Sequence, residues 1–179
     1  MDARELVERL GLQPLPLEGG YYRETYRSDV PLPGRTGRAI STAIYYLLTP
    51  ETFSAMHRLA SDEIFHFYAG DPVEMLQLHP DGSHEIILIG NDIEAGQRPQ
   101  VVVVRGVWQG CRIADLAPAL SCEERGRVGY ALMGTTVAPG FEPEDYEHGD
   151  RSALAAQYPQ CAEMIKGLTR VIEGNVDVY

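Results

Sequence analysis

Short runs of alternating apolar and polar residues fill the middle of the chain and predict β-strands. Many of them are rich in β-branched and aromatic residues, which favour strands over helices. The runs cover residues 21–28, 39–49, 53–59, 63–70, 73–90, 101–104, 107–116 and 129–139. The 73–90 run predicts a hairpin around Pro80-Asp81-Gly82, and the four valines of 101–104 predict a buried strand.

Helical patterns occur only at the two ends of the chain. Residues 2–11 predict a short helix that Asp2 caps and Gly11 ends. Residues 151–172 predict two helical pieces, which separate before Pro159 because a proline disfavours helical backbone in the residue that precedes it.

Many short strands with helices only at the ends are typical of an all-β sandwich or barrel. The 179 residues suffice for one hydrophobic core. We therefore expect a single domain, with an N-terminal helix over 1–11, a β-barrel over 12–140, and an acidic loop with C-terminal helices over 141–179.

Composition and charge narrow the partners. The formal net charge of −11 repels phosphate backbones, and the arginines form no basic patch, so we expect no nucleic-acid partner. No apolar run is long enough for a membrane span or a signal peptide, so we expect no membrane partner. Cys111, Cys122 and Cys161 are odd in number and form no CxxC pair, which favours a reducing compartment. These features predict a soluble, cytoplasmic protein.

The stretch MHRLASDEIFHFYAG, residues 56–70, contains the first chemical signal. The spacing of His57, Leu59 and Glu63 resembles the first motif of cupins, H-x-H-x(3,4)-E-x(6)-G, with leucine in the second histidine slot. Gln109 in VRGVWQ stands where the second cupin motif has its histidine.

Four blocks together resemble the cupin-5 family, long catalogued as a domain of unknown function. They are EGGYYRETYRS, HRLASDEIFHFYAGD, VVVVRGVWQG and TTVAPGFEPEDYE, within a resemblance that covers about Leu12 to Leu168. The sequence departs from the family at Val104, where proline is usual, and at Phe65, where tryptophan is usual. The resemblance implies a cupin double-stranded β-helix, that is, a jelly-roll barrel, with short helices at both ends.

The motif slots imply a polar cluster inside the barrel. Strand alternation directs His57 and Leu59 inward, and we expect Glu63, after a turn, and Gln109, from the opposite sheet, to converge on the same place. Three histidines and a carboxylate suit Fe, Mn, Ni or Zn, but leucine has no lone pair and an amide oxygen is a weak ligand. We therefore expect no metal and no other cofactor. These buried polar groups either form hydrogen bonds with one another, with Glu63 bridging His57 and Gln109, or form them with a bound ligand.

The segment 19–28 offers further ligand-binding candidates. Tyr21, Tyr22 and Tyr26 supply rings and hydroxyls, while Arg23 and Arg27 supply cationic groups. Such a combination suits a sugar or a flat heterocycle. The alternative is an ordinary edge strand with aromatic packing.

Two more residues are candidates on weaker grounds. Arg58 could hold a phosphate or carboxylate at a pocket mouth, or form a salt bridge with an acid. His66 faces the opposite side of its strand by alternation, so an interface role is the alternative. Ser54 is out of phase with the cluster, and no spacing assigns a role to Tyr146 or His148.

Three functions follow from these observations. The first is a metal-independent isomerase or epimerase for a sugar or nucleotide-sugar, which is implied by the resemblance of the barrel to the deoxysugar epimerases, also cupins. In this chain, His57 or Glu63 would abstract a proton and a tyrosine would return it, while Gln109 would polarise the carbonyl and an arginine would hold phosphate. The second is a non-catalytic module that binds a nucleotide or sugar, and the third is a divergent metal-dependent cupin.

The sequence leaves open whether the protein is an enzyme. The expected partner is a small molecule, namely a sugar phosphate, nucleotide or nucleotide-sugar. We also expect a homodimer, since cupin barrels have open sheet edges that can pair across a two-fold axis.

Overall fold

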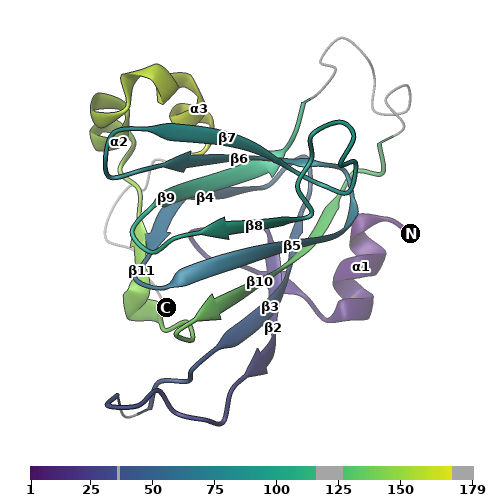
Figure 1. Ribbon diagram of the computed structural model, residues 1–179. Coiled ribbons are helices and arrows are strands. Elements are labelled where there is room, and N and C mark those ends of the chain that lie inside the picture. Colours follow the sequence, from purple (N-terminus) through teal and green to yellow (C-terminus); the bar gives the residue numbers. More distant parts are fainter. Residues whose placement is uncertain (36, 116–126, 171–179) are drawn as a thin grey trace.

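Two antiparallel sheets face each other and form a jelly-roll barrel (Figure 1). The computed structural model describes residues 1–35, 37–115 and 127–170. One sheet contains, in spatial order, β1 (Gln13–Pro14), β2 (Tyr21–Arg27), β3 (Thr42–Leu48), β10 (Ala131–Ala138), β5 (Asp62–Gly70) and β8 (Gln100–Val103). The other contains β11 (Tyr146–His148), β4 (Phe53–Leu59), β9 (Trp108–Ile113), β6 (Val73–Leu78) and β7 (His84–Ile89).

The main core lies between the two sheets. Successive side chains on a strand point to opposite faces, so every second residue enters the barrel. The inward residues at one end of the barrel form a continuous apolar cluster that includes Tyr46, Phe65, Met75, Ile87 and Met133. Burial of these large side chains is the main favourable contribution to the stability of the fold.

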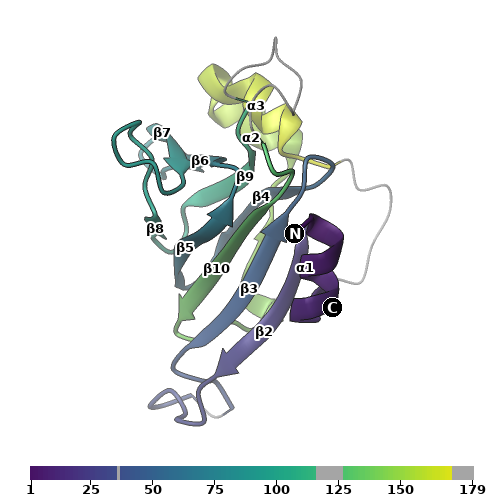
Figure 2. The same cartoon turned by 90° about the vertical axis from the view of Figure 1, so that its right-hand side faces the viewer.

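Helices cover part of the outer surface, as Figure 2 shows. The helix α1 (Ala3–Leu10) begins with a capping box at Asp2, ends at Gly11 in the left-handed conformation, and packs against the outer face of β2 and β3. The other sheet is covered by α2 (Arg151–Gln157), the short 3₁₀ segment η2 (Pro159–Cys161) and α3 (Ala162–Gly167). A second 3₁₀ segment, η1 (Pro143–Asp145), precedes β11. Across the described ranges, no helix is long and apolar enough to cross a membrane.

The predicted strands and both helical ends are confirmed, with two exceptions in detail. The strands β1 and β11 were not predicted, because segments of two and three residues carry no periodicity. The prediction of a buried strand at 101–104 was wrong for half of its valines. Val102 and Val104 are 51% and 55% exposed, because β8 is an edge strand whose outer face is uncovered and Val104 lies just beyond its end. Residue 116 of the predicted strand 107–116 and residues 171–172 of the predicted C-terminal helix lie outside the described residues.

Candidate functional site

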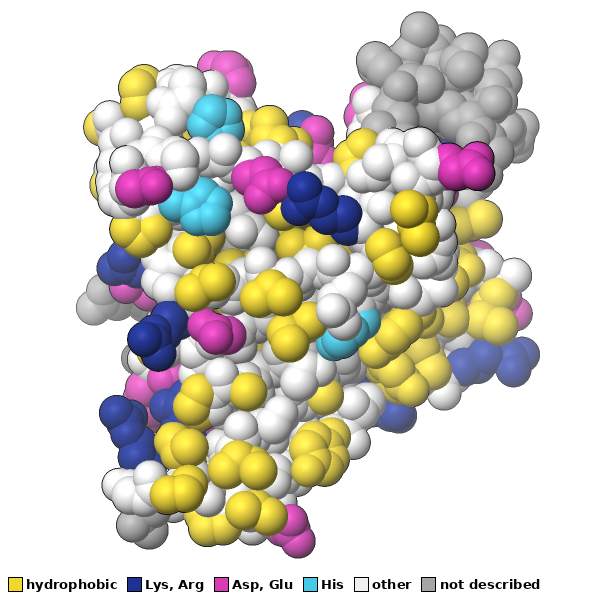
Figure 3. Space-filling model, viewed as in Figure 1, with side chains coloured by type: hydrophobic (Ala, Val, Ile, Leu, Met, Phe, Trp, Pro, Cys, Tyr) yellow, Lys and Arg dark blue, Asp and Glu magenta, His cyan; other side chains and the backbone are white. Residues whose placement is uncertain are grey.

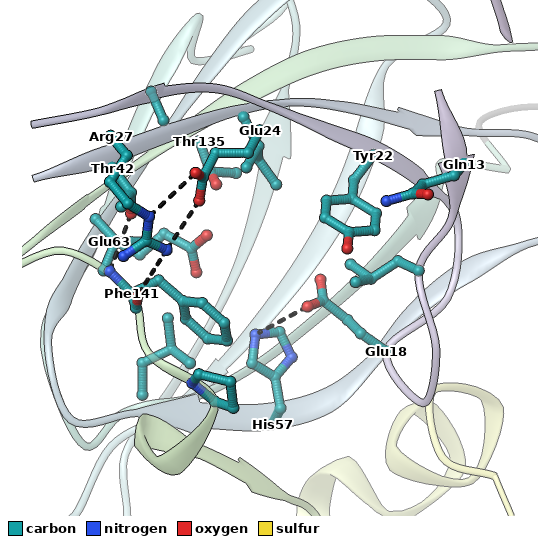
Figure 4. A pocket seen from close by; sticks show the side chains of 16 residues that line it. Gln13, Glu18, Tyr22, Glu24, Arg27, Thr42, His57, Glu63, Thr135 and Phe141 are labelled. Atoms are coloured by element: carbon teal, nitrogen blue, oxygen red, sulfur yellow. Dashed lines mark hydrogen bonds and ion pairs between the residues drawn. The ribbon is translucent and has the colours of Figure 1, made fainter. Parts of the chain in front are cut away.

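The barrel interior opposite the apolar cluster contains a cavity of about 280 Å³ (Figure 4). Six strands contribute to it, namely β1, β2, β3, β4, β5 and β10, together with the loop between β1 and β2 and the segment after β10. Its polar lining includes Glu18, Tyr22, Glu24, Arg27, His57, Glu63 and Thr135. The remainder is mostly apolar, so the cavity combines a few convergent polar groups with an apolar wall, as small-molecule sites usually do.

His57 is held in one tautomer at the wall of this cavity. The side chain is 1% exposed, and its Nδ1 lies 2.8 Å from the carbonyl oxygen of Ala55. A carbonyl oxygen only accepts hydrogen bonds, so Nδ1 carries the proton and Nε2 presents a lone pair. His57 is therefore arranged as a base or a hydrogen-bond acceptor.

A β-bulge on β4 creates this arrangement. Ser54 pairs with Cys111 and His57 pairs with Gln109, so β4 has one more residue than β9 between these two pairs. Gly110 lies opposite the bulge, where a Cβ atom would be 2.7 Å from Met56 Sδ and 3.1 Å from the Ser54 carbonyl oxygen. The extra residue lets Ser54 and His57 reach the same polar cluster, although alternation predicted that they are out of phase.

Gln109 joins His57 to Glu63. Its Nε2 lies 2.6 Å from Glu63 Oε2 and 3.3 Å from His57 Nε2. The bridging residue is thus the glutamine, whereas the self-satisfied cluster predicted from the sequence had Glu63 as the bridge. The expected origin of Gln109 was also wrong: β9 is the neighbour of β4 in one sheet, and Glu63, on β5, is the residue that comes from the opposite sheet.

One buried polar atom of the cluster, Gln109 Oε1, has no hydrogen-bond partner in the part of the chain that the structure describes. Glu63 is also buried, and this burial raises the pKa of its carboxyl. The charge of Glu18 raises that pKa further, while His57, Thr135 and Gln109 act in the opposite direction. A carboxyl with a raised pKa is suited to both donating and accepting a proton.

Glu18 is the site residue that the sequence pattern missed. Its Oε2 lies 3.9 Å from His57 Nε2, the contact drawn as a dashed line in Figure 4, and its Oε1 accepts a hydrogen bond of 2.9 Å from Ser54 Oγ. The loop that carries it is fixed by Ala55, whose N–H donates to the Glu18 carbonyl oxygen, and by Gly19, with φ of +101°. The one signal in the sequence was the Gly-Gly pair that follows Glu18.

Arg27 and Glu24 form another polar part of the cavity wall. The Arg27 guanidinium donates from Nε and Nη2 to the two carboxylate oxygens of Glu24, at 3.1 and 2.9 Å. It also donates to Glu142 at 2.8 Å and to the carbonyl oxygen of Phe141 at 3.1 Å. Most of its donors are therefore used before any ligand arrives.

A stacked aromatic pair supports His57 from its own sheet. The Tyr146 ring stacks on the His57 ring with 5.1 Å between centroids, and the Tyr146 hydroxyl lies 3.1 Å from His148 Nδ1. Burial lowers the pKa of His148. β11 thus positions His57 through a ring contact that the sequence did not indicate.

Among the predicted ligand-binding residues, Tyr22 and Arg27 line this cavity, whereas Gln109, Tyr26, Arg23, Arg58 and His66 do not. Tyr26 is 54% exposed, and Arg23 stacks on Tyr45 at 5.6 Å. Arg58 stacks on the Trp108 ring at 4.5 Å and donates twice to Glu147.

His66 lies near Gln100 and Thr136, in the direction that alternation predicted. Like Arg58, it faces away from the cavity because inward and outward positions alternate along a strand.

The donor set does not fit the transition-metal site of a cupin. Leu59 lines the cavity in the second histidine slot, and within the described ranges no group of three or more His, Cys, Asp or Glu side chains could hold a metal ion. We therefore derive no chemical step through a metal.

Residues 4–149 match the family described as the cupin superfamily, DUF985. The protein YML079W of Saccharomyces cerevisiae is 32% identical over 141 residues, and the match covers 72% of this chain and 66% of the yeast protein. The chain thus spans just under two thirds of the length of that relative.

Two solved structures resemble the chain over nearly its whole length. Protein SO0799 from Shewanella oneidensis is 31% identical with a TM-score of 0.82, covering 96% of this chain and 99% of its own. A hypothetical protein from Leishmania major is 32% identical with a TM-score of 0.82, covering 96% of this chain and 100% of its own. Oxalate decarboxylase from Bacillus subtilis shares only 13% identity at a TM-score of 0.52, over 92% of this chain and 41% of its own, which is a likeness of fold alone.

Proposed function

Because the chain belongs to the cupin superfamily, in the family DUF985, we propose that it binds a small polar molecule inside the barrel and acts on it as a metal-independent isomerase or epimerase. The expected family and fold are confirmed; the activity is our proposal. The observation that carries it is the position of His57 at the wall of the cavity, where its Nε2 lies 3.9 Å from the Glu18 carboxylate and 3.3 Å from the Gln109 amide that binds Glu63.

The proposed chemistry is proton transfer next to a carbonyl group. His57 Nε2 takes the proton from the carbon α to the carbonyl, and the negative charges of Glu18 and Glu63 stabilise the imidazolium that forms. Tyr22 returns the proton. Tyr22 is favoured over Tyr26 for this role because Tyr22 lines the cavity and Tyr26 is exposed.

The size of the cavity limits the substrate. About 280 Å³ is at the lower end of the usual range for ligand pockets and suits a molecule the size of a monosaccharide. This volume does not support an enclosed nucleotide-sugar, one of the ligands expected from the sequence.

The test is exchange of hydrogen for solvent deuterium. The protein is incubated in D₂O with a panel of aldoses, ketoses and amino sugars, and deuterium at the carbon α to the carbonyl is followed by NMR. We expect exchange with at least one sugar and a loss of about 10²- to 10⁴-fold in His57→Asn, as for other general bases. Equal exchange in parent and variant would remove His57 from the mechanism.

A non-catalytic binding module is the second candidate, and one observation favours it. Gln109 already donates toward both His57 and Glu63, so the two groups are partly occupied before a ligand binds. Binding of a sugar at His57 with no exchange across the panel would select this function over the isomerase.

We also propose that the protein is a cytoplasmic homodimer. Apolar side chains gather on the outer face over β5 and β8 (Figure 3), where Tyr68, Val102 and Val104 are each about half exposed. Light scattering tests the assembly: a monomer mass would contradict it, and Val102→Lys should shift a dimer toward monomer.

The described cysteines, Cys111 and Cys161, are free and buried, which supports a reducing compartment.

A further inference from the structure

The polar groups around His57 are mainly hydrogen-bond acceptors. His57 Nε2 already accepts from Gln109 Nε2 at 3.3 Å, and the carboxylate of Glu18, which lines the cavity, lies 3.9 Å from it. Gln109 is not among the lining residues, and its amide N–H groups are used on His57 and Glu63. A ligand that pairs with the carboxyl groups of the wall must bring donors, because acceptors facing acceptors leave both sides unpaired.

The charges in the cavity also favour a ligand that brings donors, in particular a cation. Three carboxylates, those of Glu18, Glu24 and Glu63, line the cavity together with Arg27. Arg27 is bound at short distance to Glu24 and Glu142, so it compensates neither Glu18 nor Glu63. Arg170 stacks on the Phe53 ring at 4.8 Å and is not among the lining residues.

Glu18 and Glu63 also repel each other. Both side chains line the same cavity, and the charge of Glu18 is one of the causes that raise the pKa of Glu63. A positive charge between them would relieve this repulsion, whereas a phosphate would add a third negative group at the same place. Tyr22 and Phe141 add aromatic rings to the wall, and aromatic faces attract cations.

We propose that the cavity recognises a small polyhydroxylated amine, whose ammonium group binds between Glu18 and Glu63 beside His57 while its hydroxyls donate to the remaining acceptors. This inference rests on the proposed function, since it concerns the same cavity. It replaces the sugar phosphate expected from the sequence with a ligand of opposite charge.

The experiment compares three sugars that differ mainly in charge: D-glucosamine, D-glucose and D-glucose 6-phosphate. Each is titrated into the full-length protein, and the NMR signal of the His57 ring reports occupancy of the cavity. We expect glucosamine to bind about 10- to 100-fold more tightly than glucose, as for hydrogen bonds to charged groups, and glucose 6-phosphate to bind most weakly.

Three variants test whether the carboxylates cause this preference. Glu18→Gln and Glu63→Gln each keep the shape of the side chain and should reduce the glucosamine-to-glucose ratio toward one. Glu85→Gln is the matched control, because Glu85 is half-exposed on β7, is paired with Arg98, and does not line the cavity. Circular dichroism confirms folding, and either cavity variant suffices if the other fails to fold.

The outcomes separate the ligand class from the proposed function. The ligand class is overturned if glucose 6-phosphate binds at least as tightly as glucosamine, if none of the three sugars shifts the His57 signal, or if both cavity variants keep the parent ratio. Occupancy by glucose or its phosphate without a preference for the amine would overturn the ligand class and leave the proposed function standing. The proposed function fails separately, in the deuterium exchange of His57→Asn.

Discussion

The two ends of the barrel interior are built from the same strands and have opposite chemistry. On β5 the inward residue Glu63 faces the cavity, and the next inward residue, Phe65, is in the apolar core. On β10 the same change occurs between Thr135 and Met133. A step of two residues thus separates polar lining from hydrophobic core, which indicates that one end stabilises the fold while the other is left for chemistry.

This difference has an energetic consequence. Apolar burial stabilises the barrel, whereas desolvation of Glu63 and an unpartnered oxygen on Gln109 cost free energy. Functional sites often contain such groups, and the folded protein is less stable because of them. Substitutions at the two ends should therefore have effects of opposite sign, and this expectation can be tested.

Phe65→Ala should have the largest effect on stability. The ring is 1% exposed within the apolar cluster, so its removal loses buried area and leaves a void. We expect the free energy of unfolding to fall by about 3–5 kcal/mol, measured by urea denaturation. A loss below about 1 kcal/mol would mean that the apolar end collapses around the void and is less rigid than its packing indicates.

Gly110→Ala attacks the bulge that directs His57 into the polar end. The added Cβ would press on Met56 Sδ and on the Ser54 backbone, so we expect a loss of about 1–3 kcal/mol by urea denaturation. The bond from His57 Nδ1 to the Ala55 carbonyl should weaken as the bulge moves.

The imidazole ¹⁵N shifts report this bond. The parent should show the tautomer protonated at Nδ1, and the variant a mixture of tautomers. Unchanged shifts in a destabilised variant would separate the bulge from the tautomer and contradict the assignment.

The bulge also explains what the sequence could and could not predict. Periodicity predicted the strands because it is a local signal, and the resemblance to the two cupin motifs implied that His57, Glu63 and Gln109 meet. Ser54 was missed since one inserted residue reverses the alternation, which no local pattern shows. Glu18 was missed because a contact distant in sequence, from the Ala55 N–H to its carbonyl oxygen, fixes its loop. Arg58 was placed near the pocket only because it adjoins His57 in sequence.

Glu63→Gln should stabilise the protein in a pH-dependent way. The folded pKa of Glu63 lies above its ordinary value of 4.5, so protonation of this carboxyl stabilises the folded state relative to the unfolded state. That contribution is complete below about pH 4.5 and is lost as the pH rises through the folded pKa. The variant lacks this loss. Above the folded pKa, its free energy of unfolding should therefore exceed that of the parent by about 1.4 kcal/mol for each unit by which folding raises the pKa of Glu63.

Urea denaturation between pH 4 and pH 8 measures the effect, with Glu85→Gln as the control that should follow the parent. If the difference between Glu63→Gln and the parent does not grow with pH, Glu63 is not the desolvated acid of the polar end.

Arg58→Ala should have the smallest effect, and it tests whether the contrast depends on facing the cavity. Arg58 directly follows His57 in sequence, but its guanidinium lies over Trp108 and pairs with Glu147 outside. Both partners of this pair are substantially exposed, at 39% and 55%, so solvent screens it and its loss should cost at most about 1 kcal/mol. Since Arg58 does not line the cavity, glucosamine should bind to the variant as it binds to the parent. Weaker binding in a variant of normal stability would mean that charge outside the barrel also selects the ligand, and the two ends of the interior would no longer suffice to explain recognition.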